Sequence, residues 1–147
     1  MSTPLFHLSI PVADLDVARG FYVDLLGCRL GRSGARRMDI DFFGHHVVAH
    51  LAPEEAARGV DRFHSDGVDV SVRHFGVIVD RNAWDGARAR LEAAGVDFSM
   101  TPQVIREGTV EEQAIMMMPD GCGNIVELKS IARDRVFART GEATDSP

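Results

Sequence analysis

Cysteine, tryptophan and tyrosine are scarce in this chain of 147 residues, and it has no long apolar run. The two cysteines, Cys28 and Cys122, form neither a CxxC pair nor a zinc-binding spacing, which excludes a disulfide scaffold and predicts two reduced thiols. No segment approaches the roughly 18 apolar residues of a membrane span. Because the first residues carry neither a basic region nor a cleavage signal, we expect a cytoplasmic protein with no membrane partner.

An excess of positive charge is also missing. The chain has 16 Lys and Arg against 22 Asp and Glu, a formal net charge of -6, so a nucleic-acid partner is not expected. The sequence contains no GxSxG, P-loop, GxGxxG or HExxH motif, which excludes the hydrolases, nucleotide-binding proteins and zinc proteases that these motifs mark. What is present is ordinary globular composition, with 45% hydrophobic and 26% charged residues.

The chain contains an internal repeat. The segment Phe6–Gly27 has a counterpart in Arg73–Gly95, and each places a histidine at the start of an apolar run, then a capping residue, then a helical pattern closed by glycine. Asp14 is expected to cap the first helix and Asn82 the second. Short strand-like segments follow both helices, at 38–43, 46–51, 96–100, 113–118 and 124–130.

Each half is therefore predicted to be a βαβββ module of an α+β protein. We place the first module at about 5–52, a polar linker with a short helix at about 53–70, and the second module at about 71–130. A further helical stretch and a frayed tail are expected over 131–147. All of it forms one domain, 1–147.

The alternation of strand side chains predicts which groups share a face. His7 and His74 occupy equivalent positions in the repeat, and each is followed two residues later by a small residue, Ser9 or Gly76, that leaves room above the ring. Glu127 lies on the polar face of the last strand, where a carboxylate needs a cation or a proton. Two histidines and one carboxylate form a ligand set that suits Fe(II), with Mn(II) close behind.

Two further histidines share a face of one strand. His46 and His50 are candidate catalytic residues, either orienting a ligand, transferring protons or supplying a fourth ligand. Two half-exposed histidines without a function are an equally good interpretation. Asp39 and Asp41 share a face of the preceding strand, and we expect both to be solvated.

The order and spacing of three segments resemble the vicinal oxygen chelate superfamily, which includes glyoxalase I, bleomycin-resistance proteins and type I extradiol dioxygenases. The segments are HLSIPVADLDVARGFYVDLLG, HFGVIV and PDGCGNIVELK, and FFGHHVVAHL is similar to small predicted extradiol-dioxygenase proteins. The resemblance implies a curved, cup-like mixed sheet built from two modules, with helices outside. It also implies that His7, His74 and Glu127 bind the metal. The glyoxalase I branch has a fourth ligand, commonly glutamate, where this chain has His46, Val48 and His50.

This departure favours a dioxygenase of the extradiol type, which cleaves or oxygenates a vicinal-diol-like small molecule bound to Fe(II), with dioxygen as co-substrate. His50 or His46 would then be the acid/base, and Gln113 and Lys129 would bind substrate oxygens. Two alternatives stay open: a glyoxalase-like isomerase or lyase using Mn(II), Ni(II) or Zn(II), and a metal-free binding protein for a drug. The resemblance also implies a homodimer, in which His7 meets the His74 of its own chain or of its partner.

Overall fold

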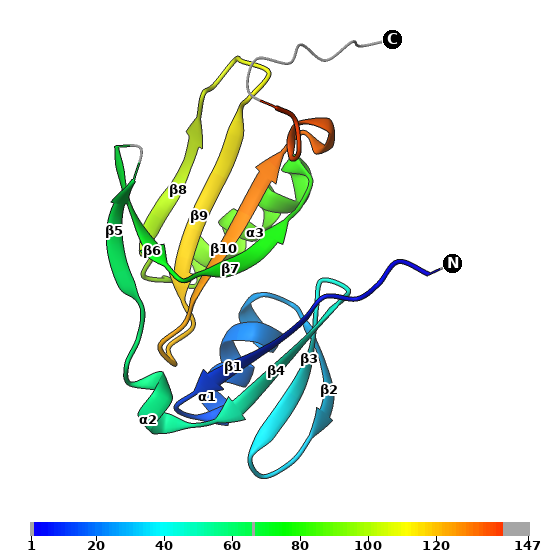
Figure 1. The fold of residues 1–147 in the computed structure, drawn as a ribbon, viewed down its shortest axis with the longest axis vertical. Helices are drawn as coiled ribbons and strands as arrows, with labels where there is room; N and C mark the ends of the chain where they lie inside the picture. The colour runs from blue at the N-terminus through cyan, green and yellow to red at the C-terminus, as the bar shows by residue number, and fades with distance from the viewer. Residues whose placement is uncertain (1, 66, 140–147) are drawn as a thin grey trace.

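The N-terminal half of the computed structural model, which describes residues 2–65 and 67–139, is a βαβββ module (Figure 1). Its elements are β1 (His7–Val12), α1 (Leu15–Arg19) continued by the π-helical η1 (Gly20–Leu25), β2 (Arg29–Ser33), β3 (Arg37–Phe42) and β4 (His45–Leu51). The strand order is β1-β4-β3-β2, with β1 parallel to β4. Asp14 caps the helix as expected, because its side chain accepts from the backbone N–H groups of Asp16 and Val17.

The C-terminal half repeats this arrangement. Its elements are β7 (Phe75–Ile78), α3 (Arg81–Ala93), β8 (Met100–Ile105), β9 (Gln113–Pro119) and β10 (Ile125–Ile131), with strand order β7-β10-β9-β8. The cap of α3 is Asp80 and not the expected Asn82. The strand expected at 96–100 begins only at Met100, because the N–H of Val96 still donates to Leu91 in the helix-closing turn.

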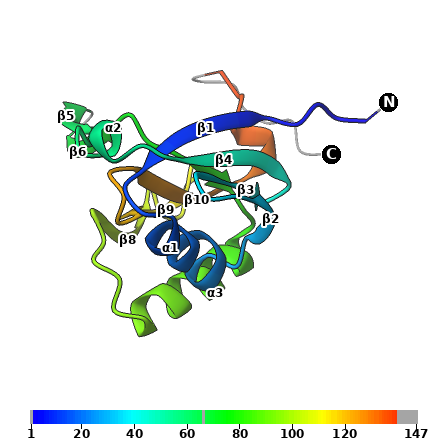
Figure 2. The same cartoon turned by 90° about the horizontal axis from the view of Figure 1, so that it is seen from below.

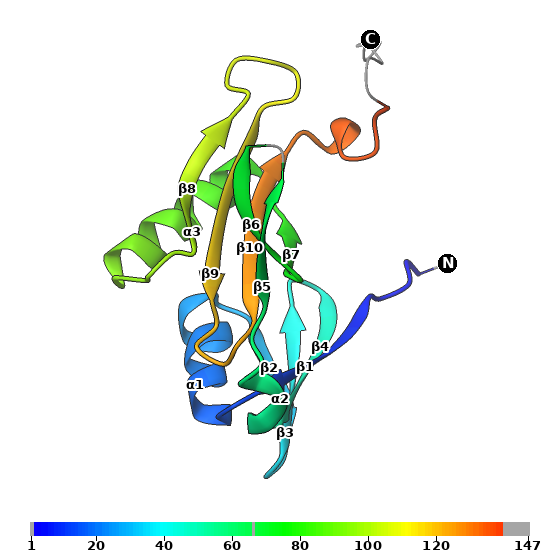
Figure 3. The ribbon, with the colours of Figure 1, turned by 60° about the vertical axis from the view of Figure 1, so that its left-hand side comes forward.

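The segment between the modules has more structure than a linker. After α2 (Pro53–Ala56), β5 (Asp61–Ser65) and β6 (Val68–Val72) form a hairpin, which Figure 3 shows in front of the C-terminal sheet. Val70 packs against the buried side chains of Met100, Ile115 and Met117, so the hairpin covers part of the C-terminal sheet. Beyond β10 the expected helical stretch is a single 3-10 turn, η2 (Arg133–Arg135), and the tail at 140–147 lies outside the described residues.

The helices α1 and α3 lie on the same side of the strands, and one core joins them to both sheets (Figure 2). A polar contact inside this core connects the modules: the buried Tyr22 hydroxyl donates to Asp120 at 2.8 Å. The side-chain amide of Asn124 also donates to the carbonyl of Pro11 at 2.8 Å. The two cysteines are buried and free, and no helix in the described part of the chain is long and apolar enough to cross a membrane.

Each sheet has one face away from the helices, and the candidate groups lie there. In β1, Ile10 and Val12 are buried in the core, whereas His7 is exposed. In β10, Val126 and Leu128 are in the core, and the alternation of the strand directs Glu127 to the opposite face. The predicted fold class and strand faces are confirmed.

Candidate metal centre

His74 and Glu127 form the nucleus of the site. His74 immediately precedes β7, and β7 pairs in parallel with β10, which carries Glu127. The Nε2 atom of His74 lies 3.3 Å from the Glu127 Oε2 atom, with 28% and 13% of the two side chains exposed. The sequence therefore correctly predicted that these two groups meet on the helix-free face of the C-terminal sheet.

The other ring nitrogen of His74 determines what can lie between the pair. Its Nδ1 atom is 2.5 Å from the backbone carbonyl oxygen of Ser71, and a carbonyl can only accept, so Nδ1 carries a hydrogen. In the neutral ring the lone pair is then on Nε2, facing a carboxylate. Two acceptors at this distance repel unless a proton or a cation lies between them.

The groups around His74 favour a proton at that position. The hydrogen bond with Glu127 raises the pKa of His74 above its usual value, against the opposing effect of burial, and the Ser71 carbonyl contributes in the same direction. Metal ligation requires the neutral imidazole, so a cation at this position would displace the proton. Nitrogen and carboxylate donors of this kind fit a divalent transition metal.

His7 contacts a different residue, His46. It stands opposite His46 in the β1–β4 register, and the Nδ1 atoms of the two rings are 2.9 Å apart. The Nε2 atom of His46 is 3.6 Å from the Asp39 Oδ2 atom. Asp39 is only 6% exposed, so the expectation that it is solvated is wrong. Strand alternation placed it on the correct face, but the side chains that cover it come from three strands and leave no signal in the sequence.

The remaining predicted residues lie around these groups. His50 is exposed on β4, opposite Pro11 in the register. The Lys129 ammonium is 3.8 Å from the Glu127 Oε1 atom, beside the candidate ligand. Gln113 and Lys129 line one cavity of about 370 Å³. Their predicted roles in substrate binding and catalysis stay predictions.

A single copy of the chain does not assemble the full ligand set. Among residues 2–65 and 67–139, no group of three His, Cys, Asp or Glu side chains is placed to hold a metal ion. His74 and Glu127 are together on the C-terminal sheet, and His7 lies on the N-terminal sheet beside His46. Within one chain the predicted ligands are therefore divided into two half-sites, His7 on one sheet and the pair of His74 and Glu127 on the other.

Gly76 is required for a different reason from the one expected. A Cβ atom at this position would lie 1.8 Å from the backbone oxygen of Glu127, so the absence of a side chain lets β7 approach β10 closely. The residue holds His74 and Glu127 in register, and the room it provides is for backbone rather than for a ligand.

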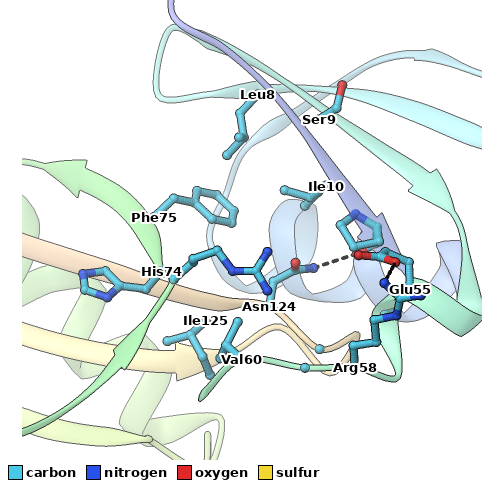
Figure 4. Close-up of a pocket in the computed structure, with 15 residues that line it drawn as sticks. Leu8, Ser9, Ile10, Glu55, Arg58, Val60, His74, Phe75, Asn124 and Ile125 are labelled. Atoms are coloured by element: carbon cyan, nitrogen blue, oxygen red, sulfur yellow. Dashed lines mark hydrogen bonds and ion pairs between the residues drawn. The ribbon is translucent and has the colours of Figure 1, made fainter. Parts of the chain in front are cut away.

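A cavity of about 210 Å³ lies between the modules, next to His74. Figure 4 shows Leu8 and Ile10 of β1 and Phe75 and Ile125 of the C-terminal module around it, with the His74 ring at its margin and directed away from them. Asn124 supplies a polar group on one side. Glu55, Arg58 and Arg73 also line the cavity, so its wall is partly charged, and Glu127 is not among its lining residues.

Comparison with known proteins agrees with this architecture. The family model of the glyoxalase/bleomycin resistance protein/dioxygenase superfamily matches residues 5–128, which spans both modules. The chain belongs to this superfamily. Among its members, a glyoxalase/bleomycin resistance protein/dioxygenase from Alicyclobacillus acidocaldarius has a crystal structure that is similar at 34% identity and a TM-score of 0.71. That match covers 92% of this chain and 96% of the other.

Fosfomycin resistance proteins have the same fold at low identity. The FosX protein of Listeria monocytogenes is 14% identical with a TM-score of 0.63, covering 91% of this chain and 98% of that one. The FosX protein of Mesorhizobium loti is 17% identical with the same TM-score of 0.63, covering 94% and 100%. At these identities the likeness shows the superfamily fold alone, and none of the curated proteins matches the chain.

Proposed function

We propose that the protein is a metal-dependent enzyme whose centre is formed by His7, His74 and Glu127, with His7 supplied by a second copy of the chain. The observation that carries the proposal is the pair of His74 and Glu127. The Ser71 carbonyl fixes a hydrogen on Nδ1 of His74, so in the neutral ring the Nε2 lone pair faces a carboxylate oxygen at 3.3 Å. A proton or a metal cation can lie between these two atoms, and an imidazole nitrogen beside a carboxylate is a donor pair that suits a divalent transition metal.

Exposed apolar side chains support the second copy. Leu5 and Phe6, just before His7, are 68% and 57% exposed, and Val72 and Ile78, on either side of His74, are 47% and 44% exposed. Large apolar groups beside both half-sites are typical of a surface that another protein covers. Because each copy carries both half-sites, a symmetric dimer would complete two centres.

Three protein ligands leave coordination positions for substrate. A bound Fe(II) would supply the activation of dioxygen and of a substrate that chelates through two neighbouring oxygens. On β4, where a fourth carboxylate ligand would lie, the helix-free face carries His46, Val48 and His50. We therefore favour a dioxygenase of the extradiol type, with His50 as the residue that accepts a substrate proton and Lys129 and Gln113 as groups that bind substrate oxygens.

Metal content tests the proposal first. The protein is purified anaerobically, reconstituted with Fe(II) and analysed by mass spectrometry, beside His74→Ala and the control His64→Ala. His64 is an exposed hairpin residue paired with Asp69, away from the proposed ligands. We expect one iron per chain in wild type and in His64→Ala and a loss in His74→Ala. Equal iron in all three proteins would refute the ligand assignment.

Oxygen uptake distinguishes the reactions. Catechols are supplied to the iron-loaded protein, and consumption of dioxygen with ring cleavage is expected. Turnover of a hemithioacetal without oxygen consumption, on Ni(II), Zn(II) or Mn(II), would instead show the isomerase alternative. Fosfomycin belongs in the same screen because structural neighbours are fosfomycin resistance proteins. A protein that takes up no metal but binds aromatic ligands would be a binding protein.

A further inference from the structure

We propose that Asp39 is a positioning residue that acts through His46 to hold His7 as the Nδ1–H tautomer, leaving the lone pair on Nε2. The inference rests on the proposed function and deepens it, since it explains how the exposed His7 side chain is held in the tautomer that can bind a metal. It assigns a role to Asp39, which makes no contact with substrate or metal itself.

Asp39 is a buried carboxylate among three cationic or polar groups. The Arg32 Nε atom donates to its Oδ2 at 3.1 Å, and the Arg37 Nη2 atom donates to its Oδ1 at 3.2 Å. The third neighbour is His46, with its Nε2 atom 3.6 Å from Oδ2. Burial alone would raise the pKa of Asp39, but the two arginines outweigh it and lower the pKa, so the group is an acceptor at neutral pH.

The position of the hydrogen on each ring follows from that carboxylate. At 3.6 Å the His46 Nε2 atom is beyond hydrogen-bond distance of Oδ2, but the negative charge of the carboxylate favours the His46 tautomer that carries its hydrogen on Nε2, the nitrogen facing it. In a neutral His46 the lone pair is then on Nδ1. The His7 Nδ1 atom lies 2.9 Å from it and must be the donor. His7 therefore has its hydrogen on Nδ1 and its lone pair on Nε2, the atom left free for a ligand.

In both candidate ligand histidines, an acceptor behind the ring thus keeps the hydrogen on Nδ1 and leaves the lone pair on Nε2, but the acceptor differs. For His74 the acceptor at Nδ1 is the Ser71 carbonyl, and for His7 it is the His46 ring held by Asp39. Groups behind metal-binding histidines fix ring orientation and tautomer in this way. Both nitrogens of His46 are occupied in this chain of contacts, so among its predicted roles we assign that of orienting a ligand and not that of a fourth ligand.

The tautomers can be observed without metal or turnover. Two-bond 15N–1H correlation spectra of the metal-free protein at neutral pH distinguish a ring protonated on Nδ1 from one protonated on Nε2. In wild type we expect His7 to be protonated on Nδ1 and His46 on Nε2. In Asp39→Ala and in His46→Ala we expect His7 to change toward the Nε2–H form. His46 is 39% exposed in its side chain, so its replacement tests the inference if Asp39→Ala does not fold.

Asp41→Ala is the matched control. Asp41 is on the same strand and face, but it contacts Arg29 and the backbone N–H of Gly44. Its replacement should leave the His7 tautomer unchanged. A wild-type His7 with its hydrogen on Nε2, or one that does not respond to either Asp39→Ala or His46→Ala, would overturn the inference.

A metal titration measures the consequence. With Co(II) as the probe, Asp39→Ala and His46→Ala should bind about 10-fold to 100-fold more weakly than wild type and Asp41→Ala. The two proposals fail differently. A wild type without Co(II) binding but with the expected tautomers refutes the metal site and leaves the positioning by Asp39 standing. Full Co(II) binding with an Nε2–H His7 refutes the positioning alone.

Discussion

Replacing Gly76 by alanine is expected to separate β7 from β10. The added Cβ atom would lie 1.8 Å from the Glu127 carbonyl oxygen, whereas carbon and oxygen atoms in contact are about 3.3 Å apart, so the strands must move apart by about 1.5 Å. Overpacking costs about 1–3 kcal/mol, and two weakened ladder hydrogen bonds add about 1 kcal/mol each. We predict a loss of about 3–5 kcal/mol in the free energy of unfolding.

Urea denaturation measures this loss, and Gly86→Ala is the matched control. Gly86 is exposed within α3, and a Cβ atom there would meet only the end of the Arg90 side chain, at 3.9 Å. Because alanine favours the helix, that variant should gain about 0.5–1 kcal/mol. A Gly76→Ala protein within about 1 kcal/mol of wild type would refute the close approach of the two strands, since even ordinary overpacking costs more.

Three other predictions concern the N-terminal module. Tyr22→Phe removes a buried donor to Asp120 and should lower the free energy of unfolding by about 1.5–3 kcal/mol, as measured with urea; a change below about 0.5 kcal/mol would contradict a connection between the modules. Burial raises the pKa of Cys28 to about 11, so iodoacetamide should alkylate it in the native protein far more slowly at pH 8 than in urea, and equal rates would refute its burial. The hydrogen bond from Arg29 lowers the pKa of Asp41, so the ionised Asp41 stabilises the fold above its unfolded-state pKa of about 3.9, and this stabilisation is lost as pH falls through the folded-state pKa. The free energy of unfolding should therefore depend less on acid pH in Asp41→Asn than in wild type. An unchanged pH profile in the variant would count against this contact.

Much of the fold followed from local pattern. The repeat, the Asp14 cap and the alternation of strand residues gave both βαβββ modules and the correct faces of His7 and Glu127. The hairpin at 61–72 was missed because β5 is short and polar, although β6 (Val68–Val72) has a valine at every second position, which is a strand signal. The hairpin is held by packing of Val70 on a distant apolar cluster. Patterns within a segment carry no information about such a contact.

The candidate site was predictable in its parts and not in its assembly. The pairing of His74 with Glu127 followed from strand parity, because β7 and β10 are neighbours in a repeated module. The burial of Asp39 did not, since it depends on arginine side chains that reach it from β2 and β3. The separation of His7 from the other two groups depends on how the modules pack, which parity within a strand does not encode.

Metal binding by a mixed dimer tests the two-copy centre most directly. His7→Ala and His74→Ala chains are co-expressed with different affinity tags, and the mixed species is isolated through both. If His7 comes from the second copy, one of the two centres in the mixed dimer keeps all three ligands. We therefore predict one cation per mixed dimer and none in either single variant. A mixed species without metal, beside a wild type that binds one cation per chain, would contradict a centre shared between copies.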